Sequence, residues 1–193
     1  MEEHERLSIG FAVTGSFCTF SRAFAQMRLL AQEGYAITPI MSQNAYSTDT
    51  RFGRAADWVR QAEELSGHSV VHTIAQAEPI GPKKLLDLLI IAPCTGNTLG
   101  KLACGIYDTA PTLAFKSHRR NGRPVLIAVS TNDALDGSAA SIGLLMGRRG
   151  VFFVPFEQDD WHAKPTSCVA DFEKLLPAAR AALQEKQLQP LIF

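Results

Sequence analysis

The chain lacks net charge, long apolar runs and an apparent leader segment. Its 19 Lys and Arg residues balance 19 Asp and Glu residues, which argues against nucleic acid or an anionic membrane surface as the main partner. No apolar run approaches the roughly 20 residues needed to span a bilayer. The acidic start, residues 1–6, lacks the basic and apolar parts of a signal peptide. We therefore expect a cytoplasmic protein.

Cysteine is scarce and follows no recognisable pattern. The residues Cys18, Cys94, Cys104 and Cys168 have no CxxC spacing, so the sequence suggests neither a zinc site nor a disulfide framework. We expect no bound metal, and reduced, mostly buried thiols.

Apolar segments suited to strands alternate along the chain with segments of helical periodicity. Strands are predicted at residues 7–13, 35–41, 88–92, 124–130 and 151–155, and helices at 23–33, 50–65, 99–103, 109–116 and 138–146, with a last helix from 167 or 171 to 185. The alternation predicts an α/β protein with a single doubly wound (Rossmann-like or flavodoxin-like) parallel sheet and helices on both faces. We expect one domain over residues 1–193, with a core at about 7–155 and a C-terminal loop and helix at 156–193.

Four of the predicted strands end in small polar residues, at positions 15–16, 42, 94–98 and 131–132. Because the carboxyl ends of parallel strands share one edge of a sheet, these residues should converge on a crevice. One such turn is equally consistent with a helix capped by Thr95 or Asn97, but four in register indicate a binding site. The GxGxxG and GxxxxGK[ST] phosphate motifs are absent, which favours a mononucleotide over NAD or ATP.

Three segments resemble a known family: TGS at 14–16, APCTGNT at 92–98 and KLACGIYD at 101–108. They are similar to the flavoprotein family of FMN-binding cysteine decarboxylases, which has a PASANT segment followed by a K-[IL]-A-x-G-[IL]-x-D helix. The resemblance spans about residues 7–155 and implies an FMN cofactor and a homo-oligomer, either a trimer or a dodecamer. It implies that the cofactor is bound by Gly15, Ser16, Phe17, Ser42, Pro93, Cys94, Thr95, Asn97, Thr98, Ser130, Thr131 and Asn132.

The sequence also departs from the decarboxylases. Pro79 stands where their catalytic histidine is expected, and a prolyl side chain cannot exchange a proton. Cys94 and Gly96 replace small residues of the PASANT pattern, and residues 130–135 replace the substrate clamp rich in methionine and asparagine. These departures argue against decarboxylation, although Asp87 remains an alternative acid.

A further resemblance covers segments outside the common motif: IAVSTNDAL at 127–135, FVPFEQDD at 153–160, KP at 164–165 and KQLQP at 186–190. These are similar to the B-type subunits of the dipicolinate synthases of endospore-forming bacteria. The resemblance implies a flavin-type protein that works with the dipicolinate synthase A-type subunit in the mother cell. Together the two would oxidise dihydrodipicolinate to dipicolinate (pyridine-2,6-dicarboxylate). The alternative is a non-catalytic scaffold that retains the fold while the A-type subunit performs the redox chemistry.

Such a reaction removes two hydrogens from a dihydropyridine, and a flavin can accept hydride. The two substrate carboxylates need cations or N–H donors, and arginine suits planar carboxylates because its fork binds them bidentately. The candidates form one basic segment: Lys116, His118, Arg119, Arg120 and Arg123. A solvated basic loop is the alternative interpretation. The sequence identifies no catalytic residue.

Several single residues carry two interpretations. Cys94 could be a reactive thiol, but small packing residues are commoner in such turns. Cys104 is expected in the core. Asp108 could contact another copy of the chain or cap the following helix, and capping is favoured. Asp133 and Asp136 could bind a cation, although aspartates near a helix start usually cap it.

Overall fold

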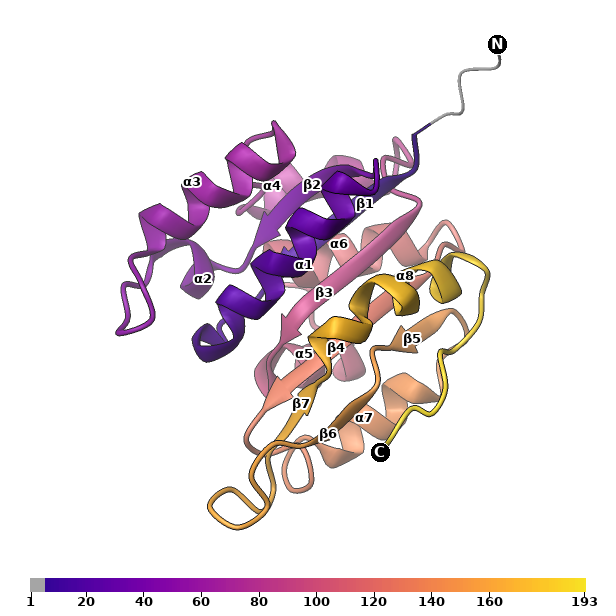
Figure 1. The fold of residues 1–193 in the computed structure, drawn as a ribbon. Helices are drawn as coiled ribbons and strands as arrows, with labels where there is room; N and C mark the ends of the chain where they lie inside the picture. Colours follow the sequence, from indigo (N-terminus) through magenta and orange to yellow (C-terminus); the bar gives the residue numbers. More distant parts are fainter. Residues whose placement is uncertain (1–5) are drawn as a thin grey trace.

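The computed structural model describes residues 6–193, so most of the acidic start, residues 1–5, lies outside the described part. Within residues 6–193 the centre is a seven-stranded sheet in the order β2-β1-β3-β4-β7-β6, with β5 paired to β4 (Figure 1). The strands are β1 (Ser8–Val13), β2 (Ala36–Met41), β3 (Leu88–Cys94), β4 (Val125–Thr131), β5 (Val151–Phe153), β6 (Phe156–Gln158) and β7 (Cys168–Ala170).

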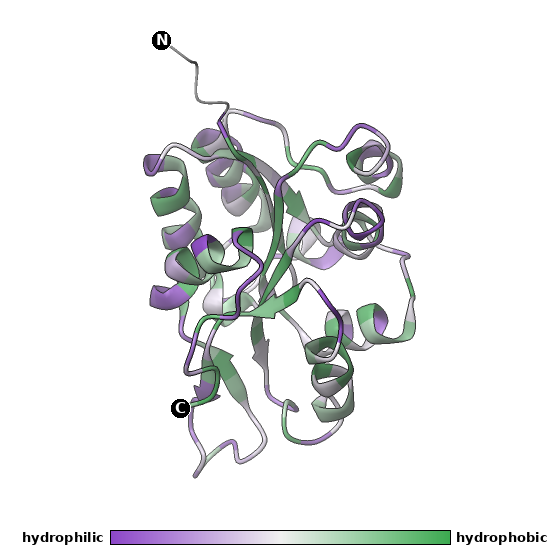
Figure 2. Cartoon of the chain, turned by 90° about the vertical axis from the view of Figure 1, so that its right-hand side faces the viewer, coloured by the Kyte–Doolittle hydropathy of each residue, from purple (hydrophilic) through white to green (hydrophobic). Residues whose placement is uncertain are grey.

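Helices cover both faces of this sheet, as Figures 1 and 2 show. One face carries α1 (Phe20–Gln32), α3 (Ala55–Ser66) and α8 (Leu175–Leu183), and the other carries α5 (Gly96–Cys104), α6 (Ala110–Arg119) and α7 (Ala139–Met146). The short helices α2 (Gln43–Ser47) and α4 (Ile74–Ala77) lie between β2 and β3 in the chain. The predicted α/β architecture is confirmed.

The strand prediction is wrong in one respect. Strands β1 to β5 pair in parallel, but β7 pairs antiparallel with both β4 and β6. The expected last strand ends at Phe153, and the segment expected as a loop forms the β6–β7 hairpin. Two strands of three residues each are too short to give an alternation that a sequence pattern can detect.

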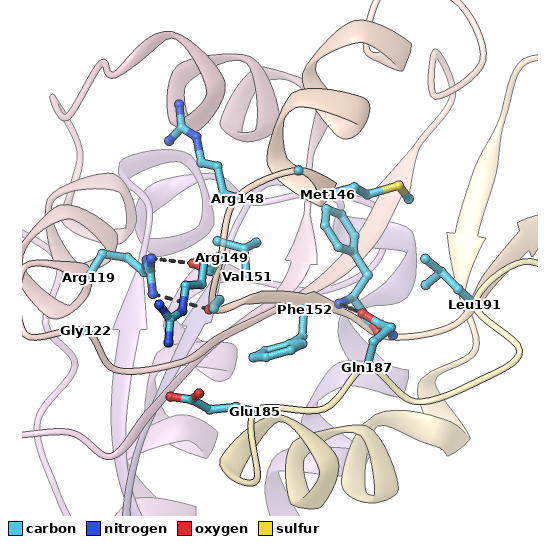
Figure 3. Close-up of a pocket in the computed structure, with 13 residues that line it drawn as sticks. Arg119, Gly122, Met146, Arg148, Arg149, Val151, Phe152, Glu185, Gln187 and Leu191 are labelled. Carbon is cyan, nitrogen blue, oxygen red and sulfur yellow. Dashed lines mark hydrogen bonds between the residues drawn. The ribbon is translucent and has the colours of Figure 1, made fainter.

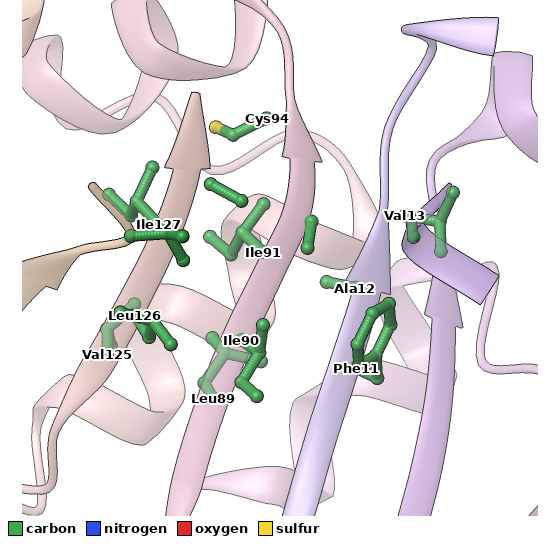
Figure 4. Close-up of a cluster of buried hydrophobic side chains, with 14 of the residues drawn as sticks. Phe11, Ala12, Val13, Leu89, Ile90, Ile91, Cys94, Val125, Leu126 and Ile127 are labelled. Carbon is green, nitrogen blue, oxygen red and sulfur yellow. The ribbon is translucent and has the colours of Figure 1, made fainter. Parts of the chain in front are cut away.

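The core is built around β1, β3 and β4. All seven residues of β3 are buried, and Figure 4 shows side chains of the three strands packed together, including Phe11, Ile90 and Ile127. Figure 2 shows the strands in green, with hydrophilic residues on the outer sides of the helices. An uninterrupted apolar run is what a strand needs when helices cover both of its faces.

The order of the strands creates a crevice. The chain runs from β1 to β2 on one side and then crosses back to place β3 on the other side of β1. Loops that leave β1 and β3 therefore diverge to opposite faces of the sheet. A ligand site is expected outside the carboxyl ends of the strands at such a switch point.

The basic segment proposed for substrate carboxylates lies at the opposite, amino edge of the sheet. His118 Nε2 lies 2.8 Å from the carbonyl oxygen of Pro124, just before β4. Arg123 pairs with Asp87 at 3.1 Å, just before β3, and Arg119 donates to carbonyls at the start of β5. These three side chains bind groups at the starts of strands, away from the crevice. The proposal that they bind the substrate carboxylates is therefore wrong.

The other two basic candidates are exposed and do not reach the crevice. Lys116 Nζ lies 5.3 Å from the centre of the Tyr107 ring, and neither Lys116 nor Arg120 lines a cleft at the carboxyl edge. Asp87 also accepts a hydrogen bond from Ser8 N. Its position at the amino edge removes it as an alternative acid for the crevice.

The thiols divide evenly between buried and exposed. Cys94 and Cys168 are buried, whereas Cys18 and Cys104 are exposed. The core position expected for Cys104 is wrong because this residue ends α5, directly before Gly105, where the chain turns away with φ of 73°.

Gly96 allows α5 to start close to β4 and α7. A Cβ at Gly96 would lie 2.6 Å from Asp133 Oδ1 and 2.8 Å from Thr131 Oγ1, and nearer still to Ser138 Oγ. The Asp133 carboxylate accepts hydrogen bonds from both hydroxyls. These contacts leave no room for a side chain at Gly96.

Replacing His118 by Gln is expected to remove a pH dependence of stability. Burial lowers the pKa of His118 to about 4, against the raising effect of the bond to Pro124. The unfolded chain therefore takes up this proton at higher pH than the folded chain. The contribution of His118 to the free energy of unfolding should be fully retained above pH 6.5 and should fall by about 3 kcal/mol as the pH drops to 4.

The measurement is urea denaturation between pH 4 and 8. In His118→Gln the side-chain amide can still donate to Pro124 O. The part of the pH dependence of unfolding free energy that comes from His118 should vanish. His162→Gln, in an exposed loop, is the control and should keep the wild-type slope. Parallel curves for His118→Gln and wild type would contradict the assignment.

Gly96→Ala is expected to destabilise the fold by about 1–3 kcal/mol, because the added methyl group must push apart the hydrogen-bonded side chains around it. Gly100→Ala, in the same helix, is the matched control. Its Cβ would meet nothing closer than Ser141 Oγ at 4.0 Å, so alanine should stabilise α5 by about 0.5–1 kcal/mol. Thermal denaturation of both variants measures the two changes in stability. Equal changes for Gly96→Ala and Gly100→Ala would refute the packing argument.

Candidate functional site

A cleft of about 670 Å³ opens at the carboxyl edge of the sheet. We call it the main cleft. Its walls come from the ends of β1, β3 and β4, from the loop before α3, and from the β6–β7 hairpin. The lining residues are Gly15, Ser16, Phe17, Cys18, Phe52, Thr95, Gly96, Asn97, Ser130, Thr131, Asn132, Asp133, Asp159, Lys164, Ser167 and Val169.

A smaller cleft of about 380 Å³ adjoins it, and we call it the side cleft. The two share Gly15, Thr95 and Asn97. The other residues of the side cleft are Thr14, Ser42, Gln43, Asn44, Thr98, Lys101 and Thr109. Apart from Gly15, every residue of the side cleft has a hydroxyl, amide or ammonium group.

Thr14 joins the two strand ends between which these clefts open. Its backbone N–H and its hydroxyl both donate to the carbonyl oxygen of Pro93, at 3.2 and 2.8 Å. The same hydroxyl accepts from Thr95 N at 3.0 Å. One side chain thus fixes the end of β1 against the turn that follows β3.

A chain of hydroxyl groups connects β1 with β4 at the base of the main cleft. Ser16 Oγ lies 2.7 Å from Ser130 Oγ, which lies 3.2 Å from Thr19 Oγ1. Thr19 also donates to the carbonyl oxygen of Ser16 at 2.9 Å. The hydroxyls fix the spacing of the two loops, and Ser16 remains part of the cleft wall.

Helix α5 begins at the boundary between the two clefts. The Thr95 hydroxyl caps it by accepting from Thr98 N at 3.3 Å, so of the two caps that the sequence left open, Thr95 and Asn97, it is Thr95 that is used. The first N–H groups of a helix and the positive end of its dipole favour an anion. Lys101, one turn further on, pairs with Asp108 at 2.8 Å. The expectation that Asp108 caps the following helix is wrong, because Thr109 caps α6.

The predicted cofactor ligands fall into three groups. The main cleft contains Gly15, Ser16, Phe17, Thr95, Asn97, Ser130, Thr131 and Asn132, and the side cleft adds Ser42 and Thr98. The remaining two, Pro93 and Cys94, line neither cleft. Cys94 is fully buried in the core (Figure 4), and burial raises the pKa of its thiol, so it is a packing residue.

Sequence reasoning assigned no binding role to the residues of the wall that closes the main cleft from the side. Asp159, Lys164, Ser167 and Val169 belong to the hairpin, and Phe52 belongs to the loop before α3. Nothing in the local pattern places these residues near β1 or β3. The polar run at 158–160 followed by Lys164-Pro165 was the one available sign of a functional loop.

The aspartates near the start of α7 do not form a cation site. Asp133 accepts from Ser138 Oγ at 2.9 Å and from Thr131 Oγ1. Asp136 lines neither cleft. Among residues 6–193, no group of three or more His, Cys, Asp or Glu side chains is placed to hold a metal ion.

A second region is also hollowed, at the amino edge of the sheet. This cleft of about 720 Å³ lies between β5, the end of α6 and the C-terminal segment (Figure 3). Its Arg119 side chain is hydrogen-bonded to the carbonyls of Arg149 and Gly150, and Gln187 bonds to both backbone groups of Phe153. These polar groups hold the edge of the sheet and are not directed at a ligand.

No helix among residues 6–193 is long and apolar enough to cross a membrane.

Comparison with known proteins agrees with this geometry. The family model described as Flavoprotein matches residues 1–138. The B-type subunit of dipicolinate synthase from Bacillus subtilis (strain 168) is 44% identical over 184 residues, which cover 95% of this chain and 92% of that protein.

Solved structures give the same result. The crystal structure of the B-type subunit of dipicolinate synthase from Bacillus halodurans has a TM-score of 0.89 and 37% identity, covering 97% of this chain and 96% of that one. The FMN-dependent cysteine decarboxylase SpaF has a TM-score of 0.67 at 21% identity, covering 93% and 97% of the two chains, and so shares the fold. This chain therefore belongs to the flavoprotein family, in the group that contains the B-type subunits of dipicolinate synthase.

Proposed function

We propose that this chain is the FMN-binding component of a dipicolinate synthase. Together with the A-type subunit, it would oxidise dihydrodipicolinate to dipicolinate. The support is the 44% identity to a B-type subunit over nearly the whole chain and the pair of adjoining clefts at the carboxyl edge of the sheet.

The single observation that carries the proposal is the different chemistry of the two clefts. The side cleft offers hydroxyls, the start of α5 and the ammonium group of Lys101, which suit a phosphate. The main cleft offers the Phe17 and Phe52 rings and the amides of Asn97 and Asn132, which suit a planar ring with a polar rim. A mononucleotide such as FMN presents these two parts a short distance apart.

The reaction removes two electrons and two protons from a dihydropyridine and leaves an aromatic ring. FMN bound in the main cleft would supply the two-electron acceptor. The residues of this chain would hold the substrate against the ring, and the β6–β7 hairpin would shield one side of the cleft from water. A homo-oligomer, trimer or dodecamer, and the A-type subunit remain part of this proposal, as does a role in the mother cell of a sporulating bacterium.

Decarboxylation fits the site poorly. Pro79 lies in the short 3-10 helix Glu78–Ile80 and lines neither cleft. Among the described residues that line the two clefts there is no histidine. These clefts therefore lack the histidine that the resemblance to the decarboxylases would require as general acid.

The purified chain is expected to bind one FMN per protomer with a Kd of roughly micromolar or tighter. Quenching of flavin fluorescence during titration, with and without the A-type subunit, measures it. Lys101→Gln should weaken FMN about 10-fold, because a charge-assisted contact to phosphate contributes about 1.5 kcal/mol. Riboflavin, which has no phosphate, should bind both proteins equally.

Lys186→Gln is the matched control, since Lys186 is exposed beyond α8, and it should bind FMN like the wild type. Absence of FMN binding even in the complex would overturn the proposal. Stoichiometric binding without flavin reduction by dihydrodipicolinate under anaerobic conditions would favour the alternative, a scaffold whose partner performs the redox step.

A further inference from the structure

The main cleft is lined by two carboxylates and one lysine. Among the described residues that line it, Asp133 and Asp159 are acidic and Lys164 is basic. A doubly charged anion entering this cleft would be repelled by both carboxylates. Lys164 is the side chain present that can offset the repulsion.

Lys164 sits on a loop whose backbone is fixed internally. The loop joins β6 to β7, and within it Lys164 N donates to Asp160 O at 2.7 Å while Ser167 N donates to Lys164 O at 3.0 Å. Gln158 Nε2 reaches across to Pro165 O at 2.8 Å. The loop can therefore place the lysine with little further ordering.

The loop is also fastened to the floor of the main cleft. Thr166 Oγ1 donates to the carbonyl oxygen of Asn132 at 2.7 Å, and Leu135 N donates to Thr166 O at 3.0 Å. Both bonds join the hairpin to the segment that follows β4. Lys164 is thus held beside the residues of β4 that line the same cleft.

The ammonium group of Lys164 has a carboxylate partner that is easily exchanged. Lys164 Nζ lies 3.2 Å from Asp159 Oδ2, and the two side chains are 56% and 28% exposed. The hydrogen bond and charge of Asp159 raise the pKa of Lys164. Burial raises the pKa of Asp159, but hydrogen bonds from Ser167 and Lys164, the charge of Lys164 and a backbone hydrogen bond together outweigh it and hold that pKa below its usual value.

An exposed ion pair of this kind contributes little to stability. Its geometry nevertheless demonstrates that a carboxylate fits against Lys164 inside the cleft wall. A ligand carboxylate can take the position of Asp159, or share the ammonium group with it, at small cost.

We propose that Lys164 binds one carboxylate of the dicarboxylate substrate and that Asp159 is its counter-ion while the cleft lacks substrate. This inference rests on the proposed function and adds to it the residue that selects a dianionic ligand. Lys164 is a substrate-binding residue here and takes no part in proton or hydride transfer.

The test is calorimetric titration with pyridine-2,6-dicarboxylate and with its neutral isostere, pyridine-2,6-dicarboxamide. Each is titrated into the FMN-loaded chain and into the flavin-free chain. Lys164→Gln should weaken the dicarboxylate about 10-fold, as expected for the loss of one charge-assisted contact. It should leave the diamide within about 2-fold of wild type, and Lys164→Arg should retain most of the dicarboxylate affinity.

Asp159→Asn should change the dicarboxylate affinity in the opposite direction. Removing the competing carboxylate should tighten the dicarboxylate about 3-fold, with no change for the diamide. Lys174→Gln is the matched control, because Lys174 pairs with Asp171 at 3.6 Å and lines neither cleft. It should bind both compounds like the wild type.

Equal affinity of wild type and Lys164→Gln for the dicarboxylate would overturn the inference, as would an equal loss for the diamide. Absence of dicarboxylate binding by the wild-type chain in both forms would do the same. Failure of FMN to bind would instead count against the proposed function. In that case the flavin-free titration still decides the role of Lys164.

Discussion

The hydroxyl of Thr14 holds together the two strand ends on which the site depends. It donates to Pro93 O and accepts from Thr95 N, so the ends of β1 and β3 cannot separate without leaving buried polar groups unpaired. The loops beyond them diverge to opposite faces of the sheet. A bond at the point of divergence sets the width of the crevice and the direction in which α5 begins.

The same constraint explains why polar residues gather there. Helix α5 starts one residue after Thr95, and its approach to β4 requires Gly96 because Asp133 and Ser138 occupy the adjacent space. The start of α5 therefore lies between the two clefts and serves as the wall of both. The site is a consequence of how the strands end, and the hairpin closes it from a distant part of the chain.

The sequence predicted the parts of this arrangement that depend on local pattern. The apolar run of β3, the polar strand ends and the Thr95 cap follow from spacing, and most of the residues proposed from them line one of the clefts. Local pattern could not place the hairpin or Phe52 at the site. The hairpin reaches it through antiparallel pairing of short strands, and Phe52 reaches it from the loop before α3. Cys94 lies at a strand end, but its side chain is buried in the core and lines neither cleft. This agrees with the favoured packing interpretation and not with the cofactor contact that the resemblance implied.

The basic residues illustrate why charge in a sequence does not identify a ligand site. Arg119 and Arg123 donate to backbone carbonyls at strand starts, where Arg123 also pairs with Asp87. A ligand could recruit them only by leaving those carbonyls unpaired. Lys101 and Lys164 pair with the side-chain carboxylates of Asp108 and Asp159. A ligand anion can replace such a carboxylate, since the displaced partner returns to water. Among the described residues that line the clefts at the carboxyl edge, these two lysines are therefore the cations available to a ligand.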